Sequence, residues 1–147
     1  MVVVESSKVN EFQWPAAILA GIIAGAVLLI VPSGSPWSGV TFFSPVIMGR
    51  TIPPADLSLV STWLLHLLLS VGYGLVISRI VASFRRGRAL LAGALMGMVL
   101  YGVNLGLVSA FWLQLRGNEI AIAFTHIVFG LVAAGAYRGL LKRQAGA

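Results

Sequence analysis

Four long stretches of this chain are almost entirely apolar, and short polar segments separate them. They run over about 14–31, 57–82, 89–112 and 120–141. A helix needs roughly 20 apolar residues to cross a hydrocarbon layer of about 30 Å. Little of the chain is left over for a water-soluble domain. The pattern therefore predicts a single all-α integral membrane domain over 1–147, with four transmembrane helices.

The two halves of the chain resemble each other. The segment 17–28 (AILAGIIAGAVL) matches 89–100 (ALLAGALMGMVL), and His66 in the second stretch matches His126 in the fourth. Each half holds two spans, so both halves enter the membrane from the same side. This predicts a parallel two-plus-two internal repeat, with a pseudo-two-fold axis along the membrane normal.

The one long connection, 32–56, is predicted to lie outside the membrane. Its segment 40–48 is too apolar for a freely solvated linker. We expect either a short helix at the outer interface or a packed loop that caps the bundle. Asp56, just after two prolines, is expected to cap the second span.

Charge is unevenly distributed between the two sides of the predicted bundle. Both termini share one side with the basic connection 83–88, and that side accounts for the whole net charge of +6. On the other side, Arg50 and Arg116 balance Asp56 and Glu119. The positive-inside rule then predicts cytoplasmic termini in a bacterial inner membrane. Topology and contact with anionic lipid explain the basic connection better than nucleic-acid binding does.

Pairs of glycines four residues apart occur on three of the four stretches. Small residues at this spacing let helix backbones approach closely in lipid, where no hydrophobic force drives helices together. We expect them to serve helix packing. The pairs are Gly21 and Gly25, Gly93 and Gly97, Gly102 and Gly106, and Gly135 and Gly139.

A polar stripe runs along the second apolar stretch. Thr62, His66, Ser70, Gly74 and Ser78 step by four residues, so they lie on one side of a helix. Polar groups that faced lipid would lack partners. We therefore expect this stripe to face the interior of the bundle.

The two histidines are the main candidates for chemistry, since a histidine inside a membrane is costly and is a functional candidate by default. The favoured interpretation is that each one bonds a carbonyl or hydroxyl and fixes helix packing. The first alternative is bis-histidine ligation of a b-type haem by His66 and His126. The second is a proton, ion or quinone site that also uses polar groups of the neighbouring spans, namely Ser70, Tyr73, Tyr101 and Asn104.

Five motifs of the chain form a recognisable set. They are Ile47-Met-Gly-Arg50, Pro53-Pro-Ala-Asp56, His66-x-x-x-Ser70-x-x-Tyr73-Gly74, Gly93-x-x-x-Gly97-x-x-x-Tyr101-x-x-Asn104, and His126-x-x-Phe129-Gly130 with Tyr137. Together they resemble a group of small bacterial four-helix inner-membrane proteins of uncharacterised activity. The resemblance covers about 15–140 and implies the four-span fold and little else. The chain departs from the pattern of the group after Asn104, at 107–112.

The sequence contains no phosphate-binding glycine loop, no paired intramembrane carboxylates and no zinc-protease motif. It also lacks cysteine, which excludes disulfides and thiolate metal sites. We therefore expect a non-enzymatic accessory or assembly subunit of a larger bacterial membrane complex, with a respiratory complex as one candidate. Its expected partners are the lipid bilayer and other membrane subunits. A haem- or quinone-binding redox module and a small channel or transporter are the alternatives.

Overall fold

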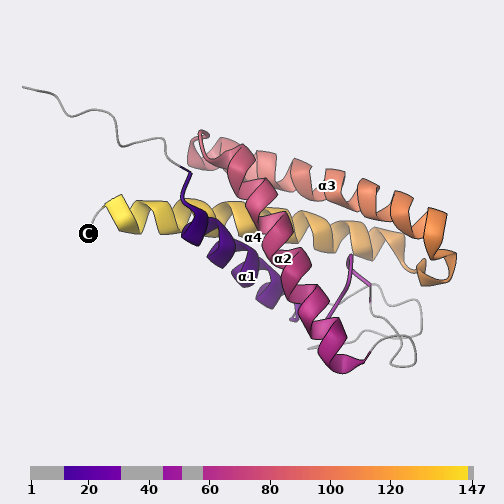
Figure 1. Ribbon diagram of the computed structural model, residues 1–147. Coiled ribbons are helices and arrows are strands. Elements are labelled where there is room, and N and C mark those ends of the chain that lie inside the picture. Colours follow the sequence, from indigo (N-terminus) through magenta and orange to yellow (C-terminus); the bar gives the residue numbers. More distant parts are fainter. Residues whose placement is uncertain (1–11, 31–44, 51–57, 146–147) are drawn as a thin grey trace, which may run out of the picture.

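The computed structural model describes residues 12–30, 45–50 and 58–145, and within this part the chain is helical (Figure 1). Three of the four α-helices, α2, α3 and α4, are long and apolar enough to cross a membrane, whereas α1 is shorter. The all-helical architecture predicted from the sequence is thus confirmed. The elements are α1 (Trp14–Leu28), α2 (Leu59–Val81), α3 (Arg86–Phe111), a 3₁₀ turn (Leu113–Leu115) and α4 (Glu119–Ala145).

The bounds of all four helices differ by a few residues from those expected: α2 is shorter at both ends, and α4 continues to Ala145 rather than ending at 141. Helix α1 ends at Leu28 rather than at 31, so at 1.5 Å per residue it is about 22 Å long. Helix α3 begins at Arg86, three residues before the expected start. Arginine is a good helix former, so the charged residues of the connection extend the helix rather than end it.

The helices form two hairpins that pack together. Figure 1 shows α3 and α4 running side by side, with α1 and α2 as the other pair. Helix α4 also packs against α1, and α2 contacts both α3 and α4. Within the described residues α1 and α3 do not touch. Helices α2 and α4, which carry the two histidines, therefore meet across the bundle.

Glycines make the close contacts within each hairpin. A Cβ on Gly21 would meet the backbone of Ser70, and one on Gly25 would meet the Ser70 side chain. In the second hairpin, a Cβ on Gly97 would overlap the backbone of His126. Gly93 lies equally close to α4 at Gly130. The small residues thus let α1 approach α2, and α3 approach α4, backbone to backbone.

The other glycine pairs make no such contacts. Among the described residues, Gly102, Gly106 and Gly139 have nothing within 4 Å of an added Cβ, and Gly135 has only a side-chain atom of Leu90, at 3.5 Å. Gly102 and Gly106 are exposed on α3. Spacing alone did not distinguish the pairs that pack inside the bundle from those that do not.

The polar stripe of α2 lies in the interior. Thr62, His66, Ser70, Gly74 and Ser78 are all buried. The cap of α2 is Ser58, whose hydroxyl accepts a hydrogen bond from the Ser61 N–H at 3.2 Å. The expectation of an Asp56 cap is wrong, because the helix begins at Leu59 and Ser58 occupies the N-cap position. Asp56 itself lies outside the described residues. A serine next to the first turn meets the same need for an acceptor.

A tight turn over residues 45–50 replaces part of the expected interfacial helix. Ile47 and Arg50 exchange two backbone hydrogen bonds, of 2.8 and 3.0 Å. Between them, Met48 and Gly49 have φ values of 53° and 75°, as in the two-residue turns that join hairpin strands. Left-handed backbone cannot continue a right-handed helix, so the expected helix is wrong at 45–48. Its remainder, 40–44, lies outside the described residues.

Candidate functional site

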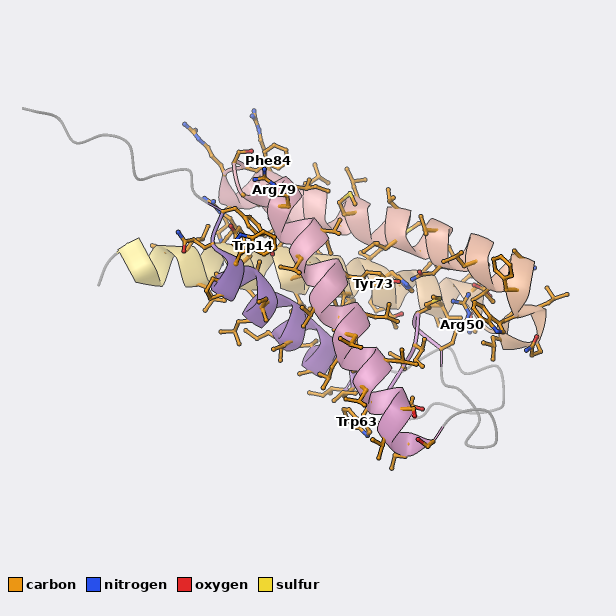
Figure 2. The ribbon with its side chains drawn as sticks, in the orientation of Figure 1. Trp14, Arg50, Trp63, Tyr73, Arg79 and Phe84 are labelled. Atoms are coloured by element: carbon orange, nitrogen blue, oxygen red, sulfur yellow. The ribbon has the colours of Figure 1, made fainter. Side chains whose placement is uncertain are left out.

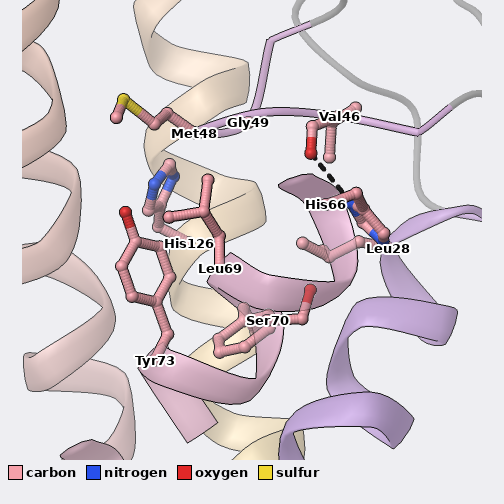
Figure 3. A pocket seen from close by; sticks show the side chains of 10 residues that line it. Leu28, Val46, Met48, Gly49, His66, Leu69, Ser70, Tyr73 and His126 are labelled. Carbon is pink, nitrogen blue, oxygen red and sulfur yellow. Dashed lines mark hydrogen bonds between the residues drawn. The ribbon is translucent and has the colours of Figure 1, made fainter. Parts of the chain in front are cut away.

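His66 and His126 line one small cavity between α2, α4 and the 45–50 turn (Figure 3). The space open to the centre of a water molecule is about 30 Å³. One water needs roughly 10–15 Å³ on this measure, so the cavity has room for about two. Ser70 and Tyr73 also line it, and the rest of the lining is mostly apolar: Leu28, Val46, Met48, Gly49, Leu69 and Phe129.

His66 lies where three segments meet, namely α2, the end of α1 and the 45–50 turn. Its Nδ1 lies 2.8 Å from the carbonyl oxygen of Val46 in the turn, a contact drawn in Figure 3. Its Nε2 lies 3.3 Å from the carbonyl oxygen of Gly25, in the last turn of α1. A neutral imidazole has one N–H, and the shorter distance favours donation from Nδ1 to Val46. His66 thereby joins the 45–50 turn to α2, while its unprotonated Nε2 lies beside the Gly25 carbonyl of α1 without a hydrogen bond to it.

His126 is held by a directional chain of hydrogen bonds. The Tyr73 hydroxyl donates to Asn104 Oδ1 at 2.7 Å, and Asn104 Nδ2 donates to His126 Nε2 at 2.8 Å. His126 Nδ1 then donates to the carbonyl oxygen of Ile122, also at 2.8 Å. This arrangement requires an imidazole with its proton on Nδ1. This series of hydrogen bonds links α2, α3 and α4 through side chains in the interior of the bundle.

A buried ion pair lies beside this network. The Arg50 side chain is 1% exposed, and its Nη2 lies 2.7 Å from Oε2 of Glu119, which is 19% exposed. Arg50 Nη1 also donates to the Met48 carbonyl at 2.9 Å. The Tyr101 hydroxyl donates to the same Glu119 oxygen at 3.3 Å. The pair therefore fastens the 45–50 turn to the start of α4.

The structure brings the six polar candidates of the sequence into one region. His66, Ser70, Tyr73 and His126 line the cavity. Asn104 reaches it through its hydrogen bonds, and the Tyr101 ring lies edge-on to His126 at 5.8 Å between centroids. Arg50, which also lies here, was not among the candidates from the sequence. Its partner lies 69 residues away, beyond any local spacing rule.

The cavity does not fit the cofactors that the sequence left open. Every ring nitrogen of the two histidines lies within 3.3 Å of a hydrogen-bonding group of the chain itself. A haem would have to displace these groups to ligate. The space that the described residues leave has room for about two waters, so a quinone ring would have to displace lining side chains such as Leu28 and Met48. The described residues hold no cluster of three metal-ligating side chains.

Loss of the Asn104 amide is expected to destabilise the bundle, because it leaves both the Tyr73 hydroxyl and His126 Nε2 without their partner. Asn104→Leu keeps the volume and should lower the free energy of unfolding by about 1 kcal/mol, since hydrogen bonds inside membrane proteins average ~0.6 kcal/mol each. Tyr73→Phe removes only one bond and should cost about half as much. Unfolding by denaturing detergent, followed by circular dichroism, measures both. Equal stabilities of the two variants would contradict the directional chain.

Comparison with protein-family models, with curated proteins and with solved structures found no match for this chain.

Proposed function

We propose that this chain is a non-enzymatic accessory or assembly subunit of a larger complex in a bacterial inner membrane. It crosses the membrane four times, with both termini in the cytoplasm. It contributes helix surfaces rather than a reactive group, and its two histidines fix the packing of its own helices.

Matching contacts in the two hairpins support the proposed repeat. An offset of 72 residues relates Gly25 to Gly97, and an offset of 60 relates His66 to His126. A Cβ on Gly25 would lie 3.4 Å from the ring of His66, and one on Gly97 would meet the backbone of His126. Equivalent glycines thus face equivalent histidines. In such a repeat both hairpins enter from one side, as the charge distribution also requires.

Some glycine pairs make helix contacts inside the bundle and others do not, and this contrast is the observation that supports the subunit role. The first pairs on α1 and α3 are buried against neighbouring helices, whereas Gly102 and Gly106 on α3 are exposed and touch nothing. Around them, Val99, Val103 and Leu107 are exposed as well. In lipid such a surface lets the backbone of another helix come close, as the inner pairs do within this chain. A helix of another subunit is the proposed occupant.

A tagged protein purified from its native host in mild detergent tests this proposal. We expect a defined partner to co-purify with the unmodified chain, and to be lost with Gly102→Leu and Gly106→Leu combined. Gly139→Leu is the matched control, because Gly139 is also exposed and free of contacts but lies on α4. That variant should retain the partner.

Two results would count against the proposal. One is recovery of the unmodified chain as a lone monomer, or only with copies of itself. The other is retention of the partner by the double α3 variant. Circular dichroism of each variant should show unchanged helix content, so that lost binding is not mistaken for lost folding.

A further inference from the structure

One end of the bundle carries exposed cations without carboxylate partners in the described part of the chain. Arg85, Arg86 and Arg88 surround the turn between α2 and α3, and Lys142 lies near the end of α4. The salt bridges of the described residues all lie elsewhere. Clustered exposed cations attract anionic groups, so this end favours contact with negative charge.

The opposite end is built differently. Arg50 is paired with Glu119 at 2.7 Å, and the Nε of Arg116 lies 3.8 Å from the same carboxylate. Both described arginines there thus have an internal counter-ion. The contrast between the two ends is a property of the fold, since a sequence count of charge does not say which cations are paired.

Two further arginines at the basic end serve the bundle itself. Arg138 donates to the carbonyl oxygen of Ala82 at 3.0 Å, and the Arg79 guanidinium lies 5.6 Å from the centre of the Phe12 ring. The exposed rings of Trp14 and Phe84 lie at this same end, as Figure 2 shows. Exposed aromatic rings of this kind sit at the level of lipid headgroups. The cations of the turn are therefore placed where phosphate groups of lipid are found.

We propose that Arg85, Arg86 and Arg88 bind the phosphodiester headgroups of anionic lipids. The adjacent Phe84 ring and the exposed apolar faces of α2 and α3 contact the acyl chains. A free phosphate or a nucleic acid would meet the same charges but would gain nothing from this apolar border. This inference adds a lipid partner to the proposed subunit role and is independent of the α3 surface.

Native mass spectrometry of the intact protein, released from mixed micelles of phosphatidylglycerol and phosphatidylcholine with identical acyl chains, tests the proposal. The unmodified chain should retain phosphatidylglycerol preferentially. Each cation near an anionic surface contributes about a fivefold preference. Arg85→Gln, Arg86→Gln and Arg88→Gln combined should therefore lower the preference by at least about tenfold, even after partial screening.

Three comparisons make the result decisive. Arg116→Gln, at the paired end, should leave the preference unchanged. The corresponding triple lysine variant should keep most of it, because it preserves the charge. A large excess of inorganic phosphate should not displace the lipid. The proposal would be overturned if the triple lysine variant or Arg116→Gln lost the preference for phosphatidylglycerol. It would also be overturned if phosphate fully displaced the lipid, or if the triple glutamine variant kept the full preference.

Discussion

Gly97→Leu is expected to separate α3 from α4 and to lower the free energy of unfolding by about 3 kcal/mol. A Cβ at this position would overlap the backbone carbonyl of His126. Backbone cannot rotate away as a flexible side chain can, so the helices must move apart. The cost then reaches the upper end of the usual 1–3 kcal/mol for overpacking. The same movement would strain the hydrogen bond between Asn104 and His126.

Gly102→Leu is the control for this prediction, since it introduces the same side chain five residues later on the same helix. No described residue lies within 4 Å of a Cβ at this position. The stability of the Gly102→Leu variant should therefore match that of the unmodified chain, or slightly exceed it through better helix propensity. Detergent unfolding followed by circular dichroism compares the two. Equal losses in both variants would mean that α3 and α4 do not pack as described.

Glu119→Gln is expected to cost about 3 kcal/mol of stability. Removing one partner of a buried ion pair leaves an uncompensated charge, which typically costs about 3–5 kcal/mol. The lower value is appropriate because the Glu119 side chain is 19% exposed, whereas that of Arg50 is 1% exposed. The same unfolding assay measures the loss.

A double variant separates the pair from its surroundings. Arg50→Met with Glu119→Leu removes both charges and should recover most of the lost stability, because replacing a buried pair by apolar groups is often neutral. Arg116→Gln should cost less than about 1 kcal/mol, as expected for an exposed ion pair, since Arg116 is 49% exposed. A double variant as unstable as Glu119→Gln alone would contradict a role for the unpaired charge.

Features with a local cause were predictable from the sequence. The helices follow from runs of apolar residues, and the buried stripe from Thr62 to Ser78 follows from a period of four. The positions of the polar residues within the apolar stretches also indicated which side chains surround the cavity. Each of these inferences needs only the geometry of one helix.

Contacts between distant segments were not predictable. Arg50 looked like a loop charge and Glu119 like a helix-terminal acid, and nothing in either neighbourhood indicates that they meet. The two histidines correspond to each other in the proposed repeat but have different partners. His66 faces backbone carbonyls of α1 and the 45–50 turn, whereas His126 faces a side chain of α3. Only the packing of the segments determines which partner each imidazole finds.

The unequal lengths of α1 and α3 concentrate the differences between the two hairpins in one place. On the proposed repeat, the last residue of α1, Leu28, corresponds to Leu100, yet α3 continues to Phe111. The additional turns contain Asn104, which orients His126, and the exposed Gly102 and Gly106. The close approach of Gly25 and Gly97 to the partner helix is common to both hairpins, whereas the amide that orients a histidine and the exposed glycine pair belong only to the longer helix.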